Sequence, residues 1–142
     1  MKQASILNTL NRLYLIENRS LAMYMVDACP WTHAGDAKAS QVMANIVSDQ
    51  KVMSQRLADL IDARGGRLHN GSFPMQFTDL NMVSLEYLVG EVARLLRQDI
   101  ESIRAAVEKL AGDREAQELA EEILGAEQAH LEALEDLTPQ PA

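Results

Sequence analysis

The stretch AEEILGAEQAHLEALEDL, Ala120–Leu137, contains the most informative pair of residues in the chain, Glu127 and His130. They lie three positions apart on the apolar face of a predicted helix, so their side chains project side by side toward a core. An ionisable pair in a core is costly unless something compensates, and a divalent cation is one such compensation. The alternative is a boundary glutamate with a buried, hydrogen-bonded histidine. The apolar residues that define this face are Leu119, Ile123, Ala126, Leu134 and Leu137.

Length and charge narrow the class of protein. A chain of 142 residues is expected to form one domain, residues 1–142, with a substantial core. The net charge of −8 disfavours nucleic-acid binding. Cys29 is the only cysteine, which excludes an intramolecular disulfide and suits a reducing compartment. Polar residues interrupt the start of the chain before any long apolar run, so we expect a cytoplasmic protein without a signal peptide or membrane span.

Residues 3–28 are predicted to form the first helix. Glu17 is the single charge in the middle of its apolar stripe, and Tyr24 lies two turns further along the same face. A helix that is apolar around most of its circumference must bury more than one face. We therefore expect a homo-oligomer, such as a homodimer, in contact through this helix, unless other helices of the chain cover it. The second apolar set is Leu7, Tyr14, Leu15, Ala22 and Met25.

Residues 36–64 are predicted to form the second helix. Gln50 interrupts its apolar stripe where a metal ligand could lie. Met53 follows three positions later, and methionine on such a stripe normally fills the core. Asp49 is rotated off the stripe and is expected to face solvent.

Residues 65–78 form the one long connection, in which Gly, Asn-Gly and Pro disfavour regular structure. Fourteen extended residues reach about 46 Å, and a helix of about 30 residues is about 45 Å long. The connection can therefore run the length of a bundle, to a third helix at residues 79–110 with Asp99 on its apolar stripe. A fourth helix at 113–137 and a tail at 138–142 complete the chain. This order predicts an all-α fold, an antiparallel four-helix bundle with a long crossover between helices 2 and 3.

Three local motifs resemble the ferritin-like superfamily, and bacterioferritin most closely. They are LNRL at Leu10–Leu13 followed by Glu17, then Tyr24 seven residues later, and E-x-x-H at Glu127–His130. The resemblance spans essentially all four predicted helices. It implies a site for two irons, with one Glu from each of the first and third helices and a Glu-x-x-His from each of the second and fourth.

Glu17, Glu127 and His130 match that ligand set, and the remaining positions depart from it. Gln50 and Met53 stand where the second helix of the family carries its Glu-x-x-His. Leu96 stands at the position of the third-helix Glu, and Asp99, about one turn on, is the nearest substitute. In bacterioferritin a methionine one residue past the second-helix Glu binds haem; here that position is Lys51, so no haem is implied.

These departures change the expected chemistry. Iron prefers carboxylate and imidazole ligands over thioether, and two nearby cations need bridging anions. We therefore predict a ferritin-like protein with an incomplete di-iron site. It would bind one iron or another divalent metal ion through Glu17, Glu127 and His130, with Asp99 or Gln50 as a further ligand. The alternative is a non-catalytic helical bundle that assembles or binds a partner without metal. A di-iron ferroxidase or oxidase with unusual ligands is the third reading, and an enzyme is not favoured.

Overall fold

The computed structural model describes residues 2–28, 37–69, 71–75, 77 and 85–137. All regular secondary structure in these ranges is helical, which confirms the predicted all-α class. None of the described helices is both long and apolar enough to span a membrane. The predicted connection 29–35, the start of the helix predicted at 79–110 and the tail 138–142 lie outside the described residues. The helices are α1 (Lys2–Asn18), α2 (Leu21–Ala28), α3 (Ala37–Ala63), α4 (Leu85–Lys109) and α5 (Arg114–Leu137).

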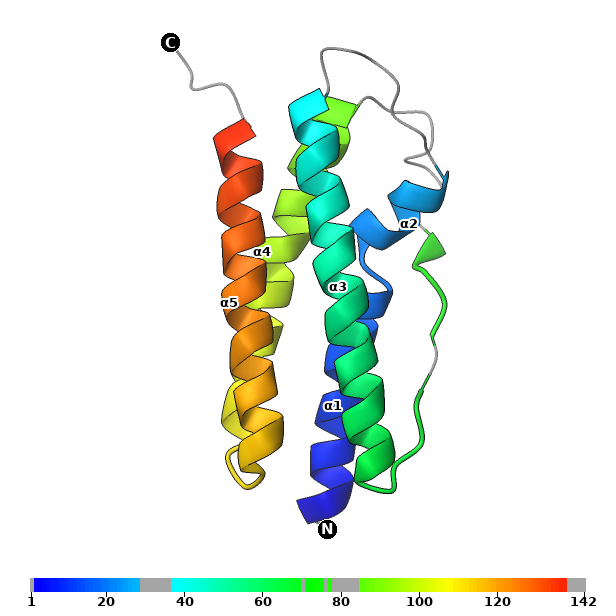
Figure 1. Cartoon of the computed structure of the whole chain (residues 1–142), viewed down its shortest axis with the longest axis vertical. Helices are drawn as coiled ribbons and strands as arrows, with labels where there is room; N and C mark the ends of the chain where they lie inside the picture. The colour runs from blue at the N-terminus through cyan, green and yellow to red at the C-terminus, as the bar shows by residue number, and fades with distance from the viewer. Residues whose placement is uncertain (1, 29–36, 70, 76, 78–84, 138–142) are drawn as a thin grey trace.

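The long helices pack as a bundle (Figure 1). α1 packs along α3, α4 packs along α5, and α3 also contacts α5. In the view of Figure 1, α1 and α5 rise while α3 and α4 descend. The segment after α3 turns back and rises along the outside of the bundle toward α2. The beginning of α4 therefore lies at the same end of the bundle as the beginning of α3.

The helix predicted at 3–28 is divided in two by Arg19 and Ser20, which lie between α1 and α2. The backbone N–H of Met23 donates to Ser20 Oγ at 3.2 Å, so Ser20 is the N-cap of α2. Apolar periodicity continues through the break, which is why the sequence pattern alone predicts one continuous helix. The break matters because it turns the Ser20 hydroxyl toward the bundle interior, as described below.

The crossover covers the second apolar face of α1. The buried amide of Asn11 joins the two, because its Nδ2 donates to the carbonyl of Arg67 at 3.0 Å and its Oδ1 accepts from the N–H of His69 at 2.7 Å. Leu7 packs so closely on Gly66 that a Cβ there would lie 2.4 Å from the Leu7 side chain. The burial of this face therefore does not require a second subunit, and the homo-oligomer stays a prediction.

The apolar core consists of two clusters separated by a layer of buried polar residues. On α1 the polar residue between the clusters is Glu17, and on α3 the polar residues are Gln50 and Ser54. On α5 they are Glu127 and His130. The cluster on the α2 side includes Met25, Ile46, Leu88, Leu96 and Leu134. The cluster toward the start of α1 includes Leu13, Leu57, Ile103, Ala120 and Ile123.

Candidate functional site

A chain of hydrogen bonds crosses the polar layer from the α1–α2 junction to α5. The Ser20 hydroxyl donates to Gln50 Oε1 at 2.6 Å. The other end of that amide, Gln50 Nε2, donates to Glu127 Oε2 at 2.9 Å. Glu127 Oε1 in turn contacts His130 Nδ1. Because Ser20 also caps α2, the break in the first helix fixes the orientation of the Gln50 amide and the oxygen of Glu127 that it meets.

His130 connects this buried chain to the surface. Its Nε2 lies 2.7 Å from Asp49 Oδ2, and the Asp49 side chain is 56% exposed. Burial by itself lowers the pKa of His130, but the carboxylates of Glu127 and Asp49 outweigh it and raise that pKa. The imidazole is therefore biased toward the charged form that pairs with both acids. Asp49 was expected in solvent; it is exposed and also bonded to the site.

Glu17 and Glu127 form a pair of neighbouring, buried carboxyl groups whose pKa values move in opposite directions. Burial, and next the charge of Glu127, raise the pKa of Glu17 well above its ordinary value. Burial acts on Glu127 in the same direction, but hydrogen bonds from His130, Glu17 and Gln50 outweigh it and lower the pKa of Glu127. These opposite shifts favour a protonated Glu17 beside an ionised Glu127.

Asp99 adds a carboxyl group from α4. Burial, and then the charge of Glu127, raise the pKa of Asp99 to about 7. The charges of Asp99 and Asp49 both act on Glu17 as well. Each of α1, α3, α4 and α5 thus contributes one carboxyl group to the same region of the bundle.

The structure brings together four of the residues predicted for the site, Glu17, Gln50, Glu127 and His130, and places Asp99 within electrostatic reach of them. Two neighbours in the sequence motifs lie elsewhere. Met53 packs against the cluster toward the start of α1, as a core-filling methionine does. Tyr24 packs on the crossover, where its ring centroid lies 5.3 Å from that of Phe73 and 5.8 Å from that of Phe77.

Ser20 and Asp49 are the two contributors that the sequence pattern does not identify. Serine is a common N-cap, so Ser20 could be identified as one from the sequence. That identification requires knowing that a new helix begins after Ser20, which the apolar pattern does not show. Asp49 has none in the periodicity, since it lies beside the apolar stripe rather than on it. Only the packing of α3 against α5 brings Asp49 to His130.

The acids and the imidazole are paired with one another rather than arranged around a common point. Within the described ranges, no group of three or more His, Cys, Asp or Glu side chains could hold a metal ion as it stands. Two buried polar atoms nevertheless lack any partner there: Glu17 Oε2 and Ser54 Oγ, the latter one turn along α3 from Gln50. Buried polar atoms in folded proteins normally have a protein, water or ion partner. The layer therefore has unused hydrogen-bonding capacity inside the core.

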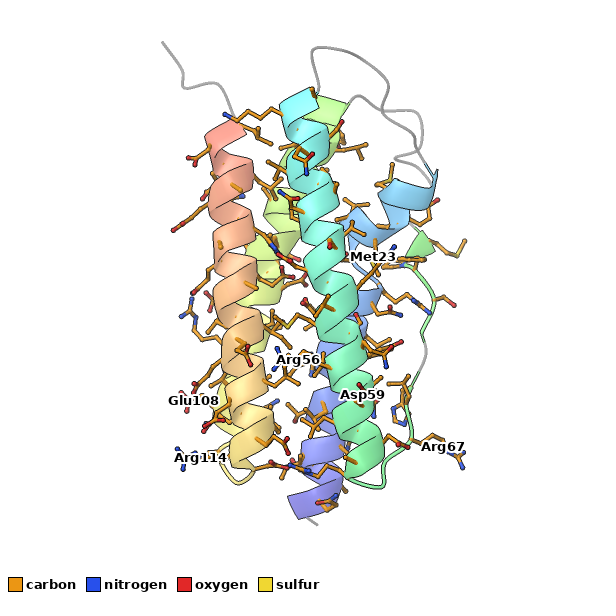
Figure 2. All side chains as sticks on the ribbon, viewed as in Figure 1. Met23, Arg56, Asp59, Arg67, Glu108 and Arg114 are labelled. Atoms are coloured by element: carbon orange, nitrogen blue, oxygen red, sulfur yellow. The ribbon has the colours of Figure 1, made fainter. Side chains whose placement is uncertain are left out.

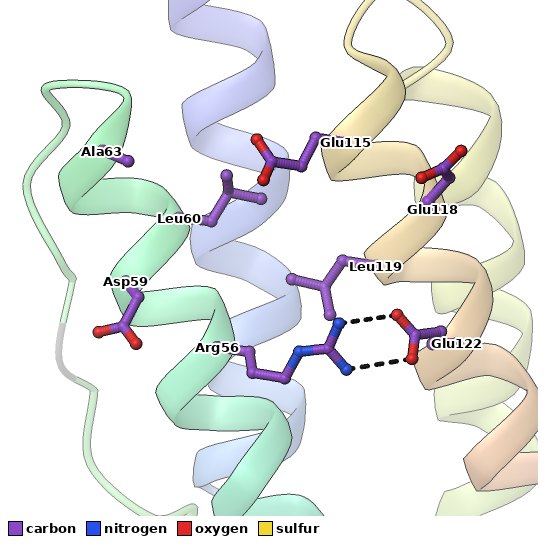
Figure 3. Close-up of a pocket in the computed structure, with 8 residues that line it drawn as sticks. All are labelled: Arg56, Asp59, Leu60, Ala63, Glu115, Glu118, Leu119 and Glu122. Atoms are coloured by element: carbon purple, nitrogen blue, oxygen red, sulfur yellow. Dashed lines mark hydrogen bonds and ion pairs between the residues drawn. The ribbon is translucent and has the colours of Figure 1, made fainter.

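A second group of charged residues lies on the surface between α3 and α5 (Figure 3). The Arg56 guanidinium donates to both oxygens of Glu122, at 3.1 and 2.7 Å, across a cleft of about 510 Å³. Asp59 and Glu118 also line this cleft. The hydrogen bonds from Arg56 lower the pKa of Glu122, and the exposed setting makes this an ordinary surface ion pair.

Comparisons with other proteins add no assignment. No protein-family model matches the sequence, and neither a curated protein nor a solved structure matches it significantly.

Proposed function

We propose that this chain is a ferritin-like antiparallel four-helix bundle that binds one divalent metal ion in its polar layer. Glu17, Glu127 and His130 would be the ligands, with Asp99 or Gln50 as a further donor. The observation that carries the proposal is that four carboxyl groups, one from each long helix, act on one another electrostatically in the polar layer, where Glu127 also pairs with the one imidazole, His130. Without a cation, burial and the charge of Glu127 raise the pKa of both Glu17 and Asp99, which favours their protonated forms.

Charge and ligand type support one ion rather than two. Carboxylate oxygen and imidazole nitrogen suit Fe²⁺, Mn²⁺ and Zn²⁺. Two ions would need bridging anions, but Gln50 supplies a neutral amide, and Leu96 is an apolar core residue at the other position where the family pattern has an acid. A di-iron enzyme is for this reason the least favoured reading.

Binding would require a small rearrangement. Glu127 and His130 would exchange their mutual hydrogen bond for bonds to the ion, and Glu17 would lose its proton. The unpartnered Glu17 Oε2 would gain a partner. Metal affinity in such a site depends on pH, because protons and the cation compete for the same oxygens.

The direct test is metal binding by chelator-treated protein that has then been freed of chelator. We expect one Mn²⁺, Zn²⁺ or anaerobic Fe²⁺ per chain, measured by equilibrium dialysis and elemental analysis. Glu17→Gln and His130→Ala should each weaken binding at least tenfold. Glu121→Gln is the matched control, because Glu121 is exposed on the same helix as His130. Metal content well below one per chain, or equal losses in Glu121→Gln, would refute the proposal.

A gain-of-ligand variant sharpens the test. Gln50→Glu restores a carboxylate where the family pattern has one, beside Glu127. We expect the variant to be less stable than the wild type without metal, because it adds an acid to a buried acidic layer. With metal it should bind more tightly than the wild type. A variant that is destabilised equally with and without metal would contradict a metal in this layer.

A metal-free bundle that assembles or binds a partner is the second candidate. It is favoured by the mutual pairing of Ser20, Gln50, Glu127, His130 and Asp49, which links most of the layer without an ion. In that case saturating metal would leave the unfolding midpoint unchanged. The mass of the protein in solution tests the assembly part, since a single-chain mass argues against a homodimer.

A further inference from the structure

A groove separate from the cleft of Figure 3 lies between the α1–α2 junction, the crossover and α4. Its volume is about 350 Å³, which is within the range of small-molecule sites. Arg12, Arg19 and Asp99 are its charged residues. The apolar side chains that line it include Leu15, Ile16, Leu21, Phe77 and Leu95.

The two arginines of this groove lack a carboxylate partner among the described residues. Arg19 donates to the carbonyls of Gly71 at 2.6 Å and Asn18 at 3.2 Å, and its guanidinium lies 5.2 Å from the centroid of the Phe73 ring. These contacts hold the side chain in place but do not balance its charge. The arginines that do pair with Asp or Glu are Arg56, Arg64, Arg94, Arg97, Arg104 and Arg114.

We propose that this groove binds a small carboxylic acid with an unbranched apolar chain. The carboxylate would pair with Arg12 and Arg19, and the chain would lie against Leu21, Phe77 and Leu95. Two guanidinium groups against one acid, Asp99, give the groove a positive balance beside an apolar wall, which is complementary to that combination of head group and chain. The groove shares Asp99 with the proposed metal site, but the binding of the acid requires no metal.

Calorimetry on the 142-residue chain in the presence of chelator tests the chemistry of the ligand. We expect decanoate to bind with one molecule per chain. Octanoate should bind more weakly, by about fourfold for each methylene removed from the buried chain. Decanol and decylamine should bind at least tenfold more weakly than decanoate, because neither supplies an anion to the arginines. Absence of decanoate binding, or equal binding of decanol, would overturn the proposal.

Variants test the location. Arg12→Gln should weaken decanoate binding at least tenfold, whereas Arg12→Lys should retain most of it. Arg67→Gln is the matched control, because Arg67 is exposed, lacks a carboxylate partner within the described residues and points away from the bundle (Figure 2). Leu95→Trp should block binding by filling the groove without changing the charge. Unchanged binding in Arg12→Gln and Leu95→Trp, or an equal loss in Arg67→Gln, would contradict a site in this groove.

Discussion

α3 and α5 are joined at two levels, and the two junctions differ in their surroundings far more than in their geometry. In the polar layer Gln50 donates to Glu127 at 2.9 Å, and both side chains are buried. On the surface Arg56 donates to Glu122 at 2.7 Å, with the two side chains 43% and 55% exposed. Water can replace a lost partner at the surface but not inside the bundle. We therefore expect the loss of a hydrogen bond to destabilise the fold more in the buried layer than on the surface, even when the two bonds are similar in length.

The largest expected effect on stability is the difference between a Glu→Gln substitution in the polar layer, at Glu127, and the same substitution on the surface, at Glu122. Glu127→Gln removes the charge that pairs with His130 and sets an amide against the Gln50 amide, so we expect a loss of about 3–5 kcal/mol in the free energy of unfolding. Glu122→Gln should change it by about 0.5 kcal/mol or less. Urea unfolding of metal-free protein measures both values. A loss below about 1 kcal/mol for Glu127→Gln would remove the distinction between the two junctions.

The next effect depends on pH and concerns Asp99. Its pKa is about 7 in the folded protein against an ordinary value of 3.8, so folding favours the protonated form. The stabilising contribution of that proton is complete below pH 4 and is lost as the pH rises through 7. In metal-free protein Asp99→Asn should therefore be more stable than the wild type by about 2–3 kcal/mol at pH 8, and nearly equal to it at pH 4.

Unfolding curves at the two pH values check this prediction. Asp59→Asn serves as the control, since Asp59 is exposed on α3 (Figure 3). A gain for Asp99→Asn of the same size at both pH values would show that Asp99 is not titrating in the layer. Saturating metal should reduce or reverse the gain if Asp99 is a ligand.

A smaller effect is expected at the junction of α1 and α2. Ser20→Ala removes both the N-cap of α2 and the donor to Gln50, so we expect a loss of about 1–2 kcal/mol. Ser20→Thr keeps a hydroxyl and should restore most of the stability. Thermal unfolding of the two variants gives the comparison, and equal stability of Ala and Thr would mean that neither hydrogen bond contributes.

These junctions also explain which parts of the site the sequence predicts. Glu17, Glu127 and His130 lie on apolar helix faces, and the sequence predicts their burial because the apolar residues of such a face pack into the core. Gln50 is identified in the same way, as an interruption of a stripe. The sequence pattern does not predict the hydrogen-bonding partner of each residue, because that partner depends on the position of each helix along its neighbour. Asp49 reaches His130 through that packing alone.

The fold, like the site, can be predicted only in part from the sequence. The all-α class and the presence of helices within residues 36–64 and 113–137 follow from periodicity and glycine positions, and the structure has α3 and α5 in those ranges. The division between α1 and α2 does not follow, since Leu21 continues the apolar pattern after the break. The sequence pattern also does not show that the Ser20 hydroxyl caps α2 and donates to Gln50 on another helix.

The smallest expected effect is the coupling energy of the surface pair, Arg56 and Glu122. A double-mutant cycle with Arg56→Gln and Glu122→Gln should give a coupling of about 0.2–1 kcal/mol that falls further as salt is added, because exposed charges are screened. The matching cycle with Gln50→Ala and Glu127→Gln should give a larger coupling with little dependence on salt, since that pair is buried and one partner is uncharged. Should the surface pair couple as strongly as the buried one, geometry rather than burial would govern both junctions. The bidentate contact of Arg56 would then stabilise the α3–α5 interface as much as the polar layer does.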